Sequence, residues 1–200
     1  MSFGAPLTLE GGHTLRVGRL PARLREAIDF EALWAMHPER PHRVRMYGRW
    51  VDTPRYQAAY GADYRYSGTV NPARPVPPRL QAIRDWAREA IDPRLDGLLL
   101  NWYDAAEGHY MGPHRDYGRD LTRGAPIVTV SFGAPRIFRI RPHGGGPFVD
   151  LDATDGDVFV MPWATNRAFT HAVPRRAADR GRRVSVTLRA FRPEAARLAR

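Results

Sequence analysis

The second half of the chain is divided into short segments rich in β-branched and aromatic residues, and this division limits the fold more than any other feature. The segments are LDGLLLNWY (95–103), PIVTVSFG (126–133), RIFRIRP (136–142), PFVDLD (147–152), GDVFVMP (156–162), AFTHAVP (168–174) and RRVSVTLRAF (182–191). Glycine, proline or aspartate turns separate them. Many short strands at regular intervals are typical of a β-sandwich or a β-barrel.

The first half of the chain predicts helices and loops. PARLREAIDFEALWAMH (21–37) has apolar residues at helical spacing, and Asp29 is suited to cap a second short helix within it. PRLQAIRDWAREAI (78–91) places its leucine, isoleucine and tryptophan on one helical face. Residues 43–68 are rich in Tyr, Trp and Arg with glycine breaks, which predicts hairpins or loops with exposed aromatic residues and no core strand.

Composition excludes several classes of protein. There are no cysteines, so disulfides, thiolate nucleophiles and zinc–thiolate sites are absent. No apolar run approaches 18 residues, which argues against a membrane span. The start, MSFGAPLTLEGGH, has no basic segment followed by an apolar stretch and does not resemble a secretion signal. We therefore expect a cytoplasmic protein.

The charge is strongly positive. The formal net charge is +10, and all 31 basic residues are arginine. Much of the excess lies between Arg175 and Arg200, where the acidic residues are Asp179 and Glu194. A basic chain favours an anionic partner, nucleic acid above all. Because abundant Arg, Ala, Gly and Pro also fit a coding bias, the charge alone leaves the partner open.

Two histidines and an aspartate form a candidate metal site. His114 and Asp116 are separated by one residue, and in a strand this spacing places both side chains on the same face. His171 lies in another predicted strand and supplies a third ligand. Two histidines with one carboxylate are the facial triad of non-haem Fe(II) oxygenases, which leaves coordination positions open. An isolated H-x-D pair is more often a polar turn, so further support is needed.

The last predicted strand provides that support. Residues 183, 185, 187 and 189 are Arg, Ser, Thr and Arg, and they alternate with Val184, Val186 and Leu188. Arginine on the inner face of a sheet is unfavourable unless an anion pairs with it. A dicarboxylate would satisfy two such guanidinium groups. A strand whose polar face is solvated is the alternative.

Together these motifs resemble the AlkB family of Fe(II)/2-oxoglutarate dioxygenases. The likeness runs from about Asn101 to Arg192 through N-x-Y, H-x-D, a distal histidine and R-x-S-x-T-x-R. It implies an α+β, mainly β fold: a double-stranded β-helix (jelly roll) core with N-terminal helices and a nucleotide-recognition lid. We expect one domain, with a helical lead-in and lid (1–92), a catalytic core (93–192) and a tail (193–200).

The resemblance also assigns roles to residues. His114, Asp116 and His171 would bind Fe(II) and form the catalytic centre, with dioxygen as co-substrate. The residues assigned to 2-oxoglutarate are Asn101, Tyr103, Arg183, Ser185, Thr187 and Arg189. Arg183, assisted by Tyr103, would pair with the distal carboxylate. Arg189 and Asn101 would support the end that chelates iron. Ser185 stands where many members have asparagine.

The implied reaction is oxidative dealkylation of N-alkylated DNA or RNA bases, with release of formaldehyde, succinate and CO2, by a monomeric enzyme. A flipped base needs aromatic cover and phosphate contacts, for which the candidates are Trp50, Tyr60, Tyr64, Tyr66, Trp163 and Arg136. One departure is Gly118, where many DNA-repair members carry an acidic residue. It motivates the alternative of a small-molecule or protein side-chain substrate. A non-catalytic, basic nucleic-acid-binding module is a third reading.

Overall fold

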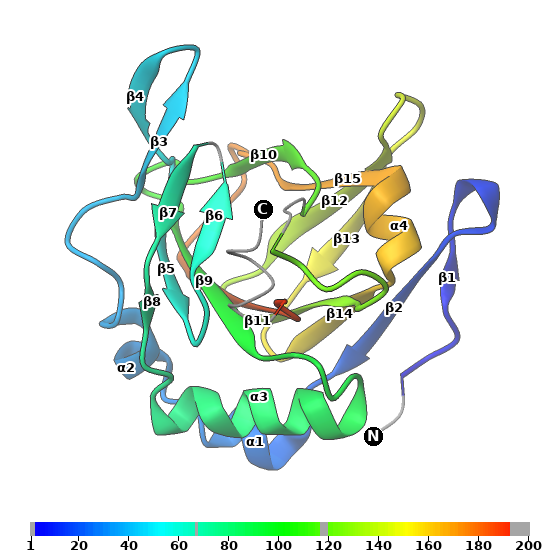
Figure 1. Ribbon diagram of the computed structural model, residues 1–200, viewed down its shortest axis with the longest axis horizontal. Coiled ribbons are helices and arrows are strands. Elements are labelled where there is room, and N and C mark those ends of the chain that lie inside the picture. The colour runs from blue at the N-terminus through cyan, green and yellow to red at the C-terminus, as the bar shows by residue number, and fades with distance from the viewer. Residues whose placement is uncertain (1–2, 67, 117–119, 193–200) are drawn as a thin grey trace.

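Two β-sheets packed face to face form the body of the protein in the computed structural model, which describes residues 3–66, 68–116 and 120–192 (Figure 1). The larger sheet has the order β1 (Leu7–Thr8), β2 (Thr14–Arg19), β14 (Asp157–Met161), β11 (Ile127–Gly133), β16 (Arg182–Arg189), β9 (Gly97–Asp104), β5 (Tyr56–Tyr60) and β8 (Ala73–Arg74). The smaller sheet has the order β10 (Met111–His114), β15 (Phe169–Val173), β12 (Arg136–Pro142) and β13 (Val149–Ala153). This arrangement confirms the predicted mainly β jelly roll.

The alternation of residues along each strand determines which side chains face the interior. On β16, Val184, Val186 and Leu188 join the hydrophobic cluster on the outer face of the larger sheet. The side chains that alternate with them point between the two sheets and are also buried; these are Arg183, Ser185, Thr187 and Arg189. Because side chains of a strand alternate between its faces, one run of eight residues supplies both an apolar outer layer and a polar inner wall.

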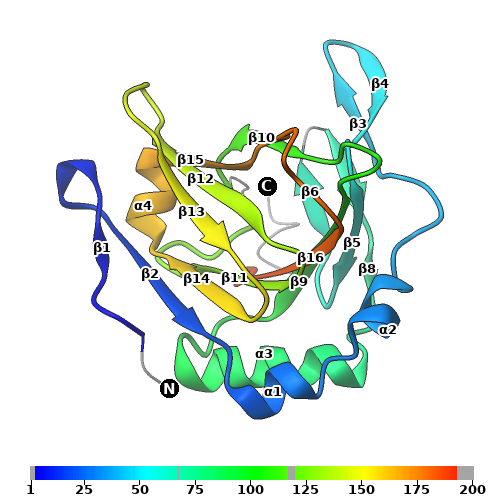
Figure 2. The ribbon, with the colours of Figure 1, turned by 180° about the vertical axis from the view of Figure 1, so that it is seen from behind.

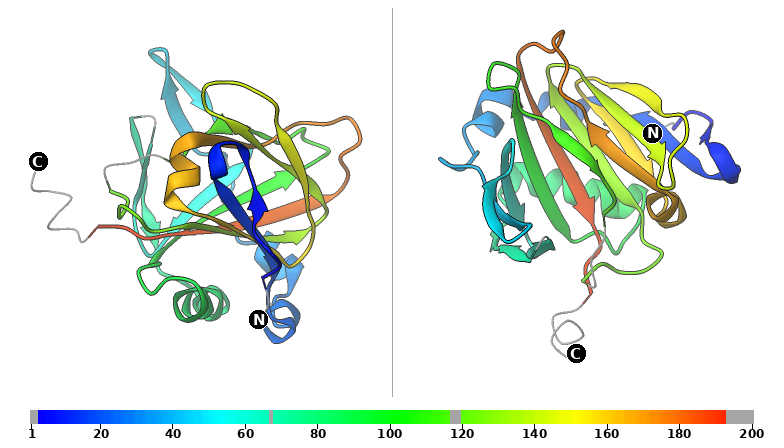
Figure 3. Two further views of the ribbon diagram at one scale, coloured as in Figure 1. Left: turned by 90° about the vertical axis from the view of Figure 1, so that its right-hand side faces the viewer. Right: turned by 90° about the horizontal axis from the view of Figure 1, so that it is seen from above.

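Helices cover the outer face of the larger sheet (Figures 2 and 3). They are α1 (Ala22–Glu26), α2 (Phe30–Trp34) and α3 (Pro78–Ala90), while η1 (Glu10–Gly12) and α4 (Trp163–Ala168) lie elsewhere. Leu80, Ile83 and Trp86 of α3 pack into the same cluster as the valines of β16. Asp29 caps α2, as predicted, by accepting from the backbone N–H of Glu31 and Ala32. Within the described ranges, no helix is long and apolar enough to cross a bilayer.

The interior between the sheets is divided into an apolar and a polar part. Phe138 and Ile140 of the smaller sheet meet Phe159 and Met161 of the larger sheet, and the rings of Phe138 and Phe159 have centroids 4.8 Å apart. The inner side chains of β9 and β16, by contrast, are largely polar. Since the apolar contacts hold the sheets together at one part of the sandwich, the polar part can house a site.

Residues 43–68 differ in part from the prediction. β3 (Arg43–Met46) and β4 (Arg49–Asp52) form a hairpin that projects from the body (Figure 1), and β6 (Tyr64–Tyr66) pairs with β7 (Thr69–Asn71). β5, however, is a buried strand of the larger sheet, so the expectation of no core strand here was wrong. Its sequence, YQAAY, has no β-branched residue, and its neighbour β9 stabilises it through pairing. Strands from the lead-in therefore extend the sandwich.

Candidate metal centre

His114, Asp116 and His171 converge at the polar part of the interior. Each offers a ligand atom, and these atoms all lie within 4.8 Å of one another. The Nε2 atom of His114 is 4.0 Å from Asp116 Oδ1, and the Nε2 atom of His171 is 3.9 Å from Asp116 Oδ2. A shift of about 1 Å would bring all three donors within bonding distance of one ion. The two histidines are direct cross-strand partners in the β10–β15 pair.

Asp116 reaches the centre by a different route from the one predicted. β10 ends at His114, so strand alternation does not place Asp116. Asn166, in α4 and fully buried, instead holds the backbone of Asp116: its Oδ1 accepts from the N–H at 3.0 Å, and its Nδ2 donates to the carbonyl at 2.7 Å. No local pattern marks Asn166, because an asparagine in a short helix resembles any polar surface residue.

The two carboxylate oxygens of Asp116 have different environments. Oδ1 accepts from Arg189 Nη2 at 2.7 Å and from the Tyr64 hydroxyl at 3.1 Å. Oδ2 is buried and has no hydrogen-bond partner among the described residues. Burial alone would raise the pKa of Asp116, but the charge of Arg189, which also donates a hydrogen bond to the carboxylate, outweighs burial and holds the pKa well below its usual range. The carboxylate is therefore ionised, with one oxygen available to a cation.

Both histidines are prepared to act as neutral ligands. His114 Nδ1 lies 3.0 Å from the carbonyl of Gly112, and since a carbonyl only accepts, Nδ1 carries the proton and Nε2 keeps its lone pair. Burial, aided by the nearby His114, lowers the pKa of His171 to about 3. Burial also lowers the pKa of His114. Two imidazoles and one carboxylate in this arrangement fit Fe(II) or a similar divalent ion.

Arg183, on the inner face of β16, is a buried arginine for which the described residues supply no anion. Arg183 is 1% exposed, and its Nε donates to Ser131 Oγ at 2.9 Å. Its Nη1 is buried with no partner in the described part of the chain, and its guanidinium lies 5.3 Å from the ring centre of Tyr103. Burial lowers the pKa of Arg183. A buried, unpaired cation is costly, so this position fits a carboxylate of a bound ligand.

The other residues predicted to bind 2-oxoglutarate share this wall. Asn101 and Tyr103 of β9 pair directly with Ser185 and Arg183 of β16. The Thr187 hydroxyl is 3.3 Å from that of Thr129. Arg189 contacts the ligand Asp116, and its Nε remains buried and unpaired among the described residues.

One further cation at this wall was not predicted. Arg55 is buried and donates from Nε to Asn101 Oδ1 at 2.7 Å. Within the described ranges it forms no ion pair with a carboxylate. Arg55 lies in the region 43–68, for which the sequence predicts hairpins or loops, and from sequence alone a buried arginine cannot be distinguished from an exposed one.

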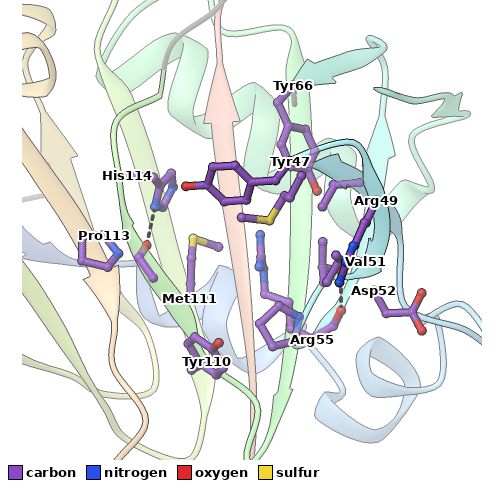
Figure 4. Close-up of a pocket in the computed structure, with 15 residues that line it drawn as sticks. Tyr47, Arg49, Val51, Asp52, Arg55, Tyr66, Tyr110, Met111, Pro113 and His114 are labelled. Carbon is purple, nitrogen blue, oxygen red and sulfur yellow. Dashed lines mark hydrogen bonds between the residues drawn. The ribbon is translucent and has the colours of Figure 1, made fainter. Parts of the chain in front are cut away.

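A cavity of about 800 Å³ leads to His114 from the β3–β4 hairpin (Figure 4). Figure 4 shows His114 on one side of it and Arg55 and Tyr66 on the other. Tyr47, at the hairpin tip, is fully exposed, and Trp50 on the same hairpin is 56% exposed. The cavity thus joins an aromatic, arginine-bearing surface to one of the three candidate metal ligands.

The residues predicted to bind substrate are not all at this cavity. Tyr66 lines it, and Trp50 lies on the hairpin beside it. Trp163 packs against the cluster of Leu99 and Phe191. Gly118 falls outside the described residues.

Two of these predictions are corrected by the structure. Tyr60 faces the helix side of the larger sheet and belongs to the core with α3, because alternation along β5 turns it outward. Arg136 is buried, and its Nη atoms donate to the carbonyls of Arg180 and Gly181 at 2.8 and 2.9 Å, so it supports the loop before β16. Neither residue is therefore placed to meet a base or a phosphate.

Comparison with known proteins identifies similar chains. The family model described as 2OG-Fe(II) oxygenase superfamily matches residues 19–189. The chain is 35% identical over 162 residues to DNA oxidative demethylase ALKBH2 of Mus musculus, which covers 76% of this chain and 67% of the relative. It is 34% identical over 162 residues to the Bos taurus protein of the same name, covering 76% and 58%. The chain thus spans little more than half the length of the latter.

Proteins of lower sequence identity to this chain include another dioxygenase and a solved structure. Alpha-ketoglutarate-dependent dioxygenase alkB homolog 3 of Homo sapiens is 30% identical over 152 residues, which is 70% of this chain and 53% of that protein. A solved structure of OsALKBH1 superposes with a TM-score of 0.54 at 18% identity, over 88% of this chain and 97% of that one. This likeness concerns the fold.

Proposed function

The chain belongs to the 2OG-Fe(II) oxygenase superfamily, and from this we propose that it removes alkyl groups oxidatively from N-alkylated nucleic-acid bases. The observation that carries the proposal is the presence of two features in the polar interior between the two sheets. One is a two-histidine, one-carboxylate triad with a free buried oxygen, and the other is Arg183, a buried arginine for which the described residues supply no anion. A divalent metal and a dicarboxylate satisfy both.

Each group of residues has a defined task in this proposal. His114, Asp116 and His171 hold Fe(II). Arg183 binds the distal carboxylate of 2-oxoglutarate, in a position that the ring of Tyr103 and the hydroxyl of Ser131 keep fixed. With Fe(II) and 2-oxoglutarate bound, dioxygen oxidises a C–H bond of the N-alkyl group, and the hydroxylated product releases formaldehyde alongside succinate and CO2.

Other residues of the chain orient ligands and exclude water. Asn101 and Arg55 form a hydrogen-bonded pair beside the site and can meet the carboxylate end that chelates the metal. The apolar cluster of Phe138, Phe159 and Phe169 fills the neighbouring part of the sandwich and excludes water from it. The ring of Phe138 lies 5.7 Å from that of His171 and protects this ligand.

Several features support a nucleic-acid substrate. Relatives at 34% and 35% identity carry the name DNA oxidative demethylase. The net charge is +10, and the projecting hairpin combines exposed Tyr47 and Trp50 with Arg43, Arg45 and Arg49. Aromatic rings stack on bases and arginines meet phosphates. A duplex base must leave its stack to enter a cavity of this kind.

The proposal is tested by turnover with defined oligonucleotides. Purified protein with Fe(II), 2-oxoglutarate and oxygen is incubated with N-methylated single- or double-stranded DNA or RNA, and with unmethylated oligonucleotides of the same sequence. We expect succinate and formaldehyde to rise together with the methylated oligonucleotides alone and to vanish in His114→Ala. If no methylated nucleic acid stimulates succinate formation, the substrate assignment fails. A rate of succinate formation that does not change with added polynucleotide or with salt concentration would instead favour a small-molecule or protein side-chain substrate.

Two further expectations belong to this proposal. We propose that the protein acts as a monomer, which light scattering coupled to size exclusion measures directly. We also propose a cytoplasmic location, which cell fractionation with an antibody against the chain measures.

A further inference from the structure

Tyr64 connects a strand beside the cavity to the metal centre. It lies on β6, and its side chain is buried between Arg189 and Phe191: the Arg189 guanidinium is 4.7 Å from its ring centre, and the Phe191 ring stands edge-on at 6.4 Å. Its hydroxyl donates to Asp116 Oδ1 at 3.1 Å. Arg189 donates to the same oxygen at 2.7 Å. Tyrosine, arginine and aspartate therefore form one buried unit.

This unit orients the carboxylate. With Oδ1 engaged by two donors, the torsion of the Asp116 side chain is fixed, and Oδ2 is left facing His171 at 3.9 Å without a hydrogen-bond partner in the described part of the chain. Hydrogen bonds to the non-ligating oxygen of a carboxylate orient the ligating one. Asp116 is thus prepared to bind a cation through Oδ2 alone.

The other connections of the β6–β7 hairpin to the body run to residues outside the triad: Arg65 pairs with Asp120 at 3.5 Å, and the Thr69 hydroxyl lies 3.2 Å from His42 Nε2. Tyr66 donates to Gln57 Oε1 at 2.6 Å, and Asn71 Oδ1 accepts from the backbone of Ala59 at 3.2 Å. Both contacts reach β5 and not the metal ligands. Among the interactions of the described residues, the Tyr64 hydroxyl is the hairpin's hydrogen bond to the triad. Tyr66 of the same hairpin lines the cavity.

We propose that Tyr64 is a positioning residue that couples metal binding at Asp116 to the order of the β6–β7 hairpin, and so to the shape of the cavity wall. A metal ion at Oδ2 fixes the carboxylate, and the carboxylate in turn fixes Tyr64. Because coupling is reciprocal, an ordered hairpin also strengthens metal binding. The proposal rests on the metal site of the proposed function, and it is independent of the substrate.

The hairpin offers a matched pair of variants, since Tyr64→Phe and Tyr66→Phe each remove one hydroxyl from β6. Phenylalanine at 64 keeps the ring against Arg189 and Phe191, and far-UV circular dichroism verifies that the fold is retained. Mn(II) affinity of the full chain is measured anaerobically from the electron paramagnetic resonance signal of free Mn(II). We expect Tyr64→Phe to weaken binding about 10- to 100-fold and Tyr66→Phe, whose hydroxyl reaches β5 and not the triad, to weaken it by a clearly smaller factor.

Hydrogen exchange supplies a second measurement. In wild type and Tyr66→Phe, Mn(II) should slow amide exchange of residues 64–66 and 69–71, and in Tyr64→Phe this protection should be lost even at saturating Mn(II). Equal Mn(II) affinity in Tyr64→Phe and wild type would overturn the coupling, as would an equal loss in both variants. Failure of the wild type to bind Mn(II) would instead refute the metal site, so the two failures are distinguishable.

Discussion

Replacing Arg183 by methionine should stabilise the protein without ligands and abolish 2-oxoglutarate binding. Arg183 is 1% exposed, and no carboxylate pairs with it within the described ranges. Methionine fills a similar volume without a charge. Stability and ligand affinity should therefore change in opposite directions, which a residue of purely structural importance would not produce.

The magnitude follows from the contacts. Replacing a buried charge by a well-packed apolar side chain stabilises by about 1–4 kcal/mol. The variant loses the hydrogen bond to Ser131, which is about 1 kcal/mol, and the contact with the Tyr103 ring, which is about 1 kcal/mol. Subtracting the two losses leaves a net gain of at most about 2 kcal/mol. Two charge-assisted hydrogen bonds to a carboxylate contribute about 3–6 kcal/mol, so the dissociation constant for 2-oxoglutarate should rise about 10²- to 10⁴-fold.

Thermal unfolding with Mn(II) bound measures both effects. At 2-oxoglutarate one hundred times above the wild-type Kd, ligand linkage stabilises the wild type by about 2.7 kcal/mol, or about 5–11 °C in Tm. The Arg183→Met variant should start from a higher Tm and show no such shift. Arg182→Met is the matched control: this neighbour forms a partly exposed ion pair with Glu31 at 2.6 Å, so its loss costs about 0–1 kcal/mol and the shift persists. A lower starting Tm with a retained shift in Arg183→Met would refute the reasoning.

Three other sites carry predictions of different kinds. Burial and the nearby His114 lower the pKa of His171 from 6.5 to about 3. Between these pH values the unfolded chain binds a proton that the folded protein does not, so the free energy of unfolding of the metal-free protein should fall by about 2 kcal/mol from pH 6.5 to 5. In His171→Asn, urea unfolding should show a free energy of unfolding that depends less steeply on pH. Asp29→Ala removes the cap of α2 and should lower the free energy of unfolding by about 1 kcal/mol, measured by denaturant titration, with turnover unchanged. Trp50→Ala, on the projecting hairpin, should change stability by less than about 0.5 kcal/mol while raising KM for methylated oligonucleotide and sparing oligonucleotide-independent succinate formation.

Local pattern was sufficient to predict most of the secondary structure. The alternation in residues 182–191 predicted β16 and its two faces, and the spacing of Leu80, Ile83 and Trp86 predicted α3. Both signals arise because one face of each element is apolar and packs against the other. The triad could be predicted because H-x-D, a distal histidine and R-x-S-x-T-x-R occur together and in order, and the structure brings the three side chains together.

Contacts between distant residues could not be predicted in the same way. Asn166 holds the backbone of Asp116 across a separation of 50 residues, and no local pattern marks it. Tyr60 and Arg136 were assigned to the substrate by residue type alone, whereas the strand face decides their surroundings. β5 escaped detection because its stability comes from pairing with β9 and not from its own residues.

The two hydrogen bonds from Asn166 to the backbone of residue 116 should allow a small carboxylate from solution to replace the side chain at this position. Because Asn166 binds the peptide N–H and C=O, the main chain should stay in place when the side chain is shortened. In Asp116→Ala, the guanidinium of Arg189 would then face a carboxylate-sized space beside two imidazoles. Added formate should enter that space and restore Mn(II) binding, and a variant that formate leaves unchanged would show that the backbone had moved. In the Asp116→Ala variant, the third metal ligand would then be set by the small carboxylate that is added to the solution.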